Sequence, residues 1–187
     1  MEESIFDELG RRKYLNLSEC RRFVAATSDL SVERETFCLL IYFTGCRISE
    51  ALDTKYSSID SEGTAIIVRT LKKRRRKEYR RIPIPKDLLN RLLRLPSPSK
   101  NKLLFSFSRS TGWRAIKEVM SNANIEGLQA TTKGLRHAFG VRCAIEKIPI
   151  NLIQRWMGHS DPSTTAIYMN IIDDEERQFA RKTWKTR

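Results

Sequence analysis

The feature that most constrains the fold is a change in the spacing of apolar residues at Gly63. Before this glycine, apolar side chains recur every three or four residues, which is typical of amphipathic helices. After it, residues 65–68 are β-rich, and a second extended stretch at 79–84 follows the entirely basic segment 72–77. Two extended runs joined by a charged connection predict a β-hairpin. Pro83 indicates that the return strand lies at a sheet edge or ends there.

The spacing of apolar residues predicts helices over most of the remaining chain. Ser18 is a good N-cap for a first helix, and Gly45 would end a second helix that follows Asp29. A short helix from Arg47 to Leu52 completes an amino-terminal helical layer. We therefore predict a mostly helical α+β domain with one small antiparallel sheet. Further helices are expected at 86–95, near Ser110, Thr132, Pro149 and Asp161, and from Asp173 onward as a charged final helix.

The charge of the chain favours a polyanionic partner. There are 35 Lys and Arg residues against 22 Asp and Glu, which leaves a formal net charge of +13. Nucleic acid is the leading candidate, and an anionic membrane surface is the alternative. No apolar run approaches the roughly 20 residues of a membrane-spanning helix, and the N-terminus does not resemble a signal peptide. We expect a soluble, cytoplasmic protein with no membrane partner.

The sequence offers no plausible metal site. It contains only two histidines, and neither stands at metal-ligand spacing from cysteines or acidic residues. Scattered carboxylates could still hold magnesium, but metal-dependent chemistry is disfavoured and we expect no cofactor. The four cysteines are far apart and are interpreted as small buried hydrophobic residues: Cys20, Cys38, Cys46 and Cys143.

Three segments beside the hairpin contain candidate functional residues. The segment 44–52 reads Thr-Gly-Cys-Arg-Ile-Ser-Glu-Ala-Leu, and the segment 133–139 reads Lys-Gly-Leu-Arg-His-Ala-Phe. The segment 156–168 contains Gly-His-Ser and ends on a tyrosine nine residues after its histidine. In this order, and with the basic hairpin between the first and second, they resemble the motifs of the tyrosine recombinases, or phage integrases. The resemblance covers about Leu15 to Tyr168.

The resemblance implies a role for each motif residue. Tyr168 would be the nucleophile, Arg47 and Arg136 the two catalytic arginines, and the hairpin lysine would reach DNA at the cleavage point. The implied catalytic set is Tyr168, Arg47, Arg136, Lys72, Lys73, Lys133 and His159, with either Lys72 or Lys73 as the hairpin lysine. Five further basic residues of the hairpin are expected to contact DNA: Arg74, Arg75, Arg76, Lys77 and Arg80.

These residue types suit the chemistry of DNA strand exchange. Displacing an alkoxide from a phosphodiester needs an in-line nucleophile, cations on the non-bridging oxygens and a proton for the leaving oxygen. Arg47 and Arg136 suit the oxygens because a guanidinium donates bidentately and keeps its charge. The hairpin lysine can donate the proton if neighbouring cations make it a stronger acid. A tyrosine, whose ordinary pKa is about 10, needs cations or a base to release its own proton.

Lys133 departs from the family pattern, which has a histidine at this position. A lysine there can still donate to a phosphate oxygen, but it cannot accept a proton at neutral pH unless it is strongly desolvated. His159 or water is therefore expected to take the proton of the tyrosine. His137 is similar to a family position with a structural role.

We expect a site-specific DNA recombinase that forms a covalent 3′-phosphotyrosyl intermediate. The alternatives are a DNA-binding accessory protein with the same fold but impaired catalysis, and a type IB topoisomerase. The expected partners are double-stranded DNA, other copies of the chain in a dimer or tetramer on DNA, and accessory DNA-bending proteins. One domain of 187 residues is expected, with no separate core-binding domain ahead of it, which is similar either to the short, catalytic-domain-only fimbrial invertases or to a fragment of a longer integrase. Its parts are a helical layer at about 15–54, the hairpin region at about 58–85, a helical catalytic region at about 86–170 and a helix or tail at 171–187.

Overall fold

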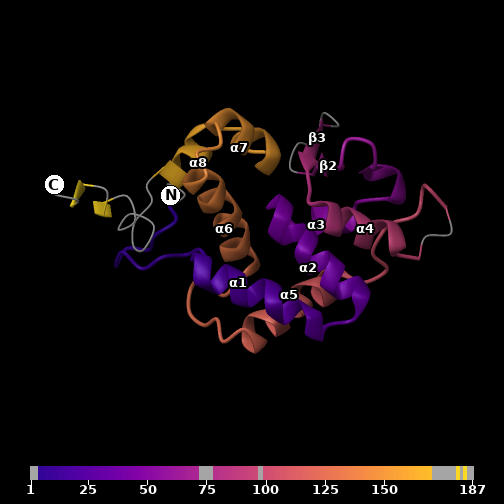
Figure 1. Cartoon of the computed structure of the whole chain (residues 1–187), viewed down its shortest axis with the longest axis horizontal. Helices are drawn as coiled ribbons and strands as arrows, with labels where there is room; N and C mark the ends of the chain where they lie inside the picture. The colour runs from indigo at the N-terminus through magenta and orange to yellow at the C-terminus, as the bar shows by residue number, and fades with distance from the viewer. Residues whose placement is uncertain (1–3, 72–77, 97–98, 170–179, 182, 185–187) are drawn as a thin grey trace.

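The computed structural model describes residues 4–71, 78–96, 99–169, 180–181 and 183–184. The elements follow the predicted order, so the mostly helical α+β fold with a small antiparallel sheet is confirmed (Figure 1). The strands are β1 (Ile59–Asp60), β2 (Ala65–Thr70) and β3 (Glu78–Pro83). The helices are α1 (Leu17–Ala26), α2 (Val32–Thr44), α3 (Ile48–Leu52), α4 (Lys86–Arg94), α5 (Arg109–Asn122), α6 (Thr132–Ile145), α7 (Ile150–Met157) and α8 (Ser163–Ala166), with short 3-10 turns η1 (Thr27–Asp29), η2 (Tyr56–Ser58) and η3 (Ile167–Met169).

The prediction for the start of α1 is wrong by two residues. The N-cap is Asn16 instead of Ser18, because Asn16 and Glu19 form a capping box. The Asn16 side chain accepts from the Glu19 N–H at 2.8 Å, and the Glu19 carboxylate accepts from the Asn16 N–H at 2.9 Å. Two of the otherwise unpaired N–H groups of the first turn are thus satisfied, which Ser18 could not achieve.

The sheet confirms the predicted hairpin. Strands β2 and β3 pair antiparallel, with Ile67 opposite Arg81, and β1 adds a third strand on the other side of β2. The strand β3 ends at Pro83 and lies at the sheet edge, as predicted. Because side chains alternate along a strand, Arg80 and Ile82 face the core while Arg81 faces solvent. The hairpin tip, 72–77, and most of the final helix predicted from Asp173 lie outside the described residues.

The helix α2 forms the centre of the domain. Residues 36–42 are all buried, because α4, α5 and α6 each pack against this helix. A helix packed on one side would bury a single stripe, and the three covering helices explain the wider burial. The helix α6 runs from the region of α1 toward α7 and α8 (Figure 1). It thereby connects the helical layer to the segment that carries Tyr168.

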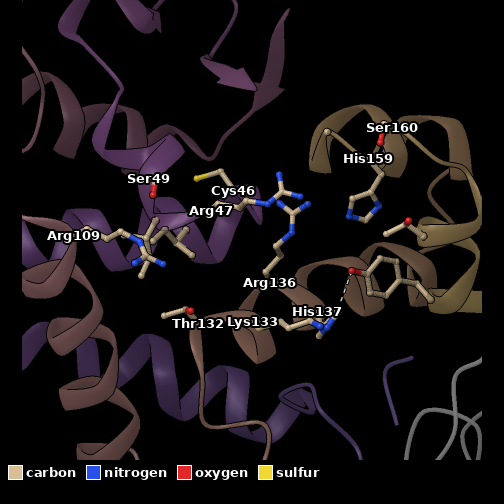
Figure 2. Close-up of a pocket in the computed structure, with 15 residues that line it drawn as sticks. Cys46, Arg47, Ser49, Arg109, Thr132, Lys133, Arg136, His137, His159 and Ser160 are labelled. Carbon is tan, nitrogen blue, oxygen red and sulfur yellow. Dashed lines mark hydrogen bonds between the residues drawn. The ribbon is translucent and has the colours of Figure 1, made fainter. Parts of the chain in front are cut away.

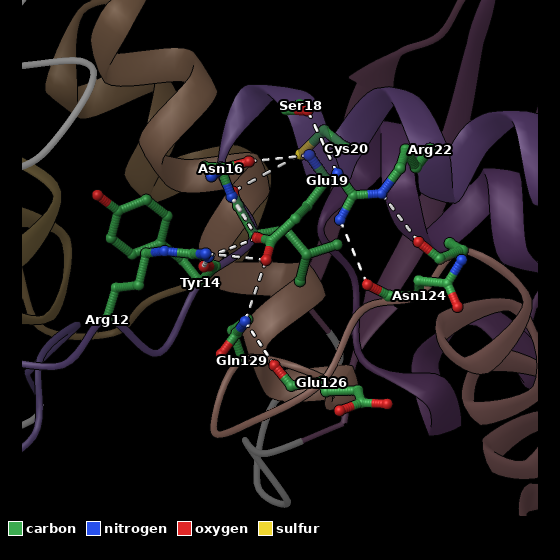
Figure 3. A network of polar contacts seen from close by, with 12 residues as sticks. Arg12, Tyr14, Asn16, Ser18, Glu19, Cys20, Arg22, Asn124, Glu126 and Gln129 are labelled. Carbon is green, nitrogen blue, oxygen red and sulfur yellow. Dashed lines mark hydrogen bonds and ion pairs between the residues drawn. The ribbon is translucent and has the colours of Figure 1, made fainter.

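A polar network joins the amino-terminal segment to the loop before α6 (Figure 3). The Arg12 guanidinium is paired with the Glu19 carboxylate, which also accepts from the Gln129 side chain at 3.1 Å. Nearby, the Nε of Arg22 donates to the carbonyl of Ala123 at 2.9 Å. These contacts fix the loop that leads into α6.

The cysteines and the hydropathy of the helices complete the description of the fold. All four cysteines are buried thiols, as predicted. Burial raises the pKa of Cys38 to about 12 and that of Cys46 to about 11. Across the described ranges, the helices are too short or too polar to cross a bilayer.

Candidate active site

A pocket of about 410 Å³ lies where the start of α3, the first turns of α6 and the segment after α7 meet (Figure 2). Five of the seven residues predicted to be catalytic line it: Arg47, Lys133, Arg136, His159 and Tyr168. The other two, Lys72 and Lys73, lie outside the described residues, as do Arg74, Arg75, Arg76 and Lys77. The fold therefore brings together residues that are up to 121 positions apart, from Arg47 to Tyr168.

The helix α6 supplies one side of this pocket. Lys133, Arg136, His137 and Gly140 stand at the i, i+3, i+4 and i+7 positions, which share one face of a helix. The helix starts sharply because the Thr131 side chain accepts from the Gly134 N–H at 2.9 Å. Lys133 is exposed in the first turn, whereas Arg136 and His137 are buried.

Arg136 is held by the carboxyl ends of two helices. Its guanidinium donates to the carbonyl of Gly45 after α2, and to that of Met157 at the end of α7 at 2.7 Å. Gly45 and Gly158 both adopt left-handed backbone conformations, with φ of 61° and 66°, and so end these helices at the right place. Carbonyls at a helix end complement a cation.

Burial, followed by the nearby Arg47 cation, lowers the pKa of Arg136 to about 10. The side chain is still charged at neutral pH. Two arginines that face the same pocket repel each other until an anion lies between them. The electrostatics of the pocket thus favour a phosphate group.

Arg47 is positioned by the carboxylate of Glu50. Arg47 is the N-cap of α3, and its N–H and its guanidinium donate to Glu50 at 2.9 Å and 3.1 Å. Burial alone would raise the pKa of Glu50, but the Arg80 cation and the bonds from Arg80 and Arg47 bring it below its usual value. Glu50 had no assigned role in the sequence analysis. The spacing from Arg47 to Glu50 at a helix start is the signal that could have found it.

The expectation that Arg80 contacts DNA is not supported by its position. Its side chain is only 3% exposed and binds the Glu50 carboxylate at 2.6 Å. It also donates to the Thr70 hydroxyl at 2.8 Å and to the Trp156 carbonyl at 2.8 Å. The alternation of β3 turns Arg80 inward, so this cation links the sheet to α3 and α7 and serves the site through Glu50.

Tyr168 lies on the turn η3 and is 1% exposed. Its hydroxyl is hydrogen-bonded to Nδ1 of His137 at 3.0 Å, the dashed contact in Figure 2. The His159 ring is stacked beside the phenol ring, with centroids 6.2 Å apart and planes 17° apart. Nδ1 of His159 is hydrogen-bonded to the hydroxyl of Thr165 at 2.9 Å. The tyrosine is thus enclosed by residues of α6 and of its own segment.

Gly140 makes room for the phenol ring. A Cβ atom at this position would lie 2.6 Å from ring atoms of Tyr168, which is closer than real Cβ contacts. Sequence reasoning missed this residue, although a glycine inside a helix costs about 1 kcal/mol and so indicates a close approach. It also missed Thr165 and the contact that His137 makes with the tyrosine. Arg109, at the start of α5, is a further cation on the pocket wall that no motif indicated.

The fold and the pocket together define a class of protein: a mostly helical domain whose buried tyrosine shares a cationic pocket with two arginines. This is the class to which the sequence motifs already pointed, the tyrosine recombinases. The chain belongs to the phage integrase family, because the model of that family matches residues 13–175. The described residues contain no group of three or more His, Cys, Asp or Glu side chains arranged to bind a metal.

Curated relatives and solved structures agree with this family. The tyrosine recombinase XerA of Pyrococcus furiosus is 31% identical over 172 residues, which cover 85% of this chain and 57% of XerA. The tyrosine recombinase XerH of Campylobacter jejuni is 27% identical over 183 residues, covering 90% of this chain and 51% of XerH. This chain therefore spans between half and two thirds of the length of these relatives.

Among solved structures, the crystal structure of XerA recombinase superposes with a TM-score of 0.77 at 26% identity, covering 93% of this chain and 65% of that one. The catalytic domain of bacteriophage HP1 integrase has a TM-score of 0.62 at 22% identity, with 90% of this chain and 93% of that domain covered. At 22% identity, the similarity to HP1 integrase concerns the fold alone. Together they establish the tyrosine recombinase catalytic fold.

Proposed function

We propose that this chain cuts and rejoins double-stranded DNA by transesterification at Tyr168. The observation that carries the proposal is the shared pocket of a tyrosine hydroxyl and two preorganised arginines, Arg47 and Arg136. Support also comes from the named activity of the XerA and XerH relatives, which are tyrosine recombinases. We expect the protein to act in the cytoplasm, as a dimer or tetramer assembled on DNA, with accessory DNA-bending proteins as further partners.

In the proposed reaction, the Tyr168 oxygen forms a bond to the scissile phosphorus while the bond to the 5′ oxygen breaks. Arg47 and Arg136 donate to the two non-bridging oxygens, where negative charge increases in the transition state. Because their positions are set by Glu50 and by helix-end carbonyls, little reorganisation is needed when the phosphate enters. The leaving 5′ oxygen takes a proton from Lys72 or Lys73.

The remaining pocket residues have supporting parts in this proposal. Lys133, exposed at the start of α6, donates to a phosphate oxygen at the rim of the pocket. His159 holds the phenol ring from one side and adds a donor near the phosphate. The 3′-phosphotyrosyl ester conserves the bond energy, so the free 5′ hydroxyl can reverse the step without ATP or a metal.

The test is a trapping experiment on nicked duplexes whose central stretch is randomised, because a nick lets the 5′ fragment diffuse away and stops resealing. Wild-type protein in excess EDTA should retain labelled DNA on a denaturing gel, and sequencing of the retained DNA should reveal the preferred site. Tyr168→Phe should retain none, whereas the control Tyr56→Phe, outside the pocket, should match wild type. DNA binding without any adduct would favour an accessory protein. Relaxation of supercoiled plasmids without strand transfer would favour a topoisomerase.

A further inference from the structure

The proposed function leaves open which group takes the proton of Tyr168. A phenol with an ordinary pKa of about 10 is almost fully protonated at neutral pH, so its attack on phosphorus requires a proton acceptor. Lys133, at the position where the resemblance implies a histidine, lies exposed at the start of α6, and a lysine side chain offers hydrogen-bond donors but no acceptor. The acceptor has to be found elsewhere in the pocket.

His159 or water was the expected acceptor, and the contacts of the His159 ring indicate a positioning part for it. Its Nδ1 is hydrogen-bonded to the hydroxyl of the buried Thr165 at 2.9 Å. Its ring lies almost parallel to the phenol ring, with 17° between the planes. Nδ1 of His159 is thus directed at Thr165, and the ring meets the phenol ring by stacking.

His137 places a ring nitrogen at the Tyr168 hydroxyl. Its Nδ1 lies 3.0 Å from the Tyr168 hydroxyl oxygen, within the range for direct proton transfer. The two rings are tilted by 57°, so this contact is a hydrogen bond and not a stacked pair. His137 is 3% exposed and lines the same pocket as Arg136, one of the arginines that would hold the phosphate.

We propose that His137 is the general base that activates Tyr168. This inference rests on the proposed function. In the forward step, the proton of the Tyr168 hydroxyl moves to Nδ1 of His137 as the oxygen bonds to phosphorus and the 5′ oxygen leaves. The neutral imidazole must therefore carry its own proton on Nε2, and it becomes an imidazolium. On rejoining, the 5′ hydroxyl gives its proton back to the hairpin lysine and attacks phosphorus, the tyrosine leaves, and His137 returns the proton to the phenol oxygen.

The surroundings of the pair support the assignment. Gly140, one turn beyond His137 on the same face of α6, leaves the space that the phenol ring occupies, with a would-be Cβ 2.6 Å from the ring. His159 covers the ring from another side. The tyrosine is thus held with its hydroxyl against His137 before DNA arrives, so proton transfer requires no search for a base.

The experiment separates a base from a merely structural residue. The variant His137→Asn keeps an oxygen close to the place of Nδ1, so it can hold the hydroxyl but cannot take its proton. Adduct formation on the nicked DNA should slow by about 10²–10⁴-fold, the usual contribution of a general base. DNA affinity and thermal unfolding should stay close to wild type. His137→Gln is the second variant if the Asn protein does not fold.

Replacement of Tyr168 by a fluorinated tyrosine, which is more acidic, provides the second measurement. It should restore much of the rate in the His137→Asn protein, and have a smaller effect in wild type. The Arg47→Ala protein is slow because it lacks a donor to the phosphate. Its rate of adduct formation should therefore rise no more with the fluorinated tyrosine than the wild-type rate does. Equal effects in all three proteins, or a wild-type adduct rate in His137→Asn, would overturn the role of His137. Absence of the adduct from wild type would instead refute the proposed function.

Discussion

Neighbouring arginines on β3 provide a sharp test of how the site is built. Arg80 and Arg81 have the same chemistry and belong to the same basic hairpin, and the alternation of side chains along a strand predicts opposite faces for them without saying which one is buried. In the structure, the Arg80 side chain is 3% exposed and pairs with Glu50, which is 1% exposed. The Arg81 side chain is 51% exposed and pairs with Asp60 at 2.6 Å. We compare Arg80→Ala with Arg81→Ala.

The two substitutions should differ strongly in their effect on stability. Removing one partner of a buried ion pair costs about 3–5 kcal/mol, because the other charge stays buried. An exposed pair contributes about 0–1 kcal/mol. For a chain of this size, each kcal/mol corresponds to roughly 2–4 °C, so Arg80→Ala should lower the Tm by about 6–20 °C, and Arg81→Ala by about 0–4 °C.

The pH dependence follows from the lowered pKa of Glu50. A carboxyl group whose pKa is lower in the folded state stabilises the fold above its ordinary value of 4.5, and this contribution is lost as the pH falls through the folded pKa. Without Arg80, the buried Glu50 would be protonated more easily. The stability difference between wild type and Arg80→Ala should therefore shrink in acid.

The assay is thermal unfolding monitored by circular dichroism. DNA affinity is measured at several salt concentrations, at a temperature below the unfolding transitions of both wild type and Arg80→Ala. Folded Arg80→Ala protein should bind DNA with the same salt dependence as wild type. An unchanged Tm together with weaker binding and a flatter salt dependence would mean that Arg80 contacts phosphate, and would refute the reasoning.

Three further substitutions test other parts of the site. Gly140→Ala places a Cβ 2.6 Å from the Tyr168 ring, so it should cost about 1–3 kcal/mol in unfolding free energy and slow adduct formation on nicked DNA. Lys133→His should retain most of the cleavage rate because both side chains can donate to a phosphate oxygen, whereas Lys133→Ala should lose it; equal rates would make the residue a bystander. Replacing Arg74, Arg75 and Arg76 with Ala should weaken binding to all DNA sequences and flatten its salt dependence, and an unchanged slope would exclude phosphate contact by the hairpin tip.

Local patterns were sufficient to predict most of the fold. Apolar spacing, Gly45 as a helix end and Pro83 at a strand end each act through the backbone nearby, and each is found where predicted. The start of α1 was missed because two good capping residues, Asn16 and Ser18, stand close together. Only the reciprocal bonds of Asn16 and Glu19 decide between them.

The site was predictable in its members but not in its geometry. The motifs identify Arg47, Arg136 and Tyr168, which the structure places in one pocket. The inward direction of Arg80 depends on the register of β3, and a shift of one residue would have buried Arg81 instead. The contact of His137 with Tyr168 joins residues 31 positions apart and depends on how η3 packs on α6. Such pairings are properties of packing between elements, and no pattern within one segment contains them.

The most direct test of the central claim is to identify the residue that becomes joined to DNA. Trypsin should release the segment 156–177 as one peptide, and Tyr168 is its only tyrosine. After trapping on nicked DNA and nuclease digestion, mass spectrometry should find this peptide carrying a nucleotide through its 3′ phosphate, with fragment ions that place the mass on Tyr168. A nucleotide on another residue, or attachment through a 5′ phosphate, would contradict the account.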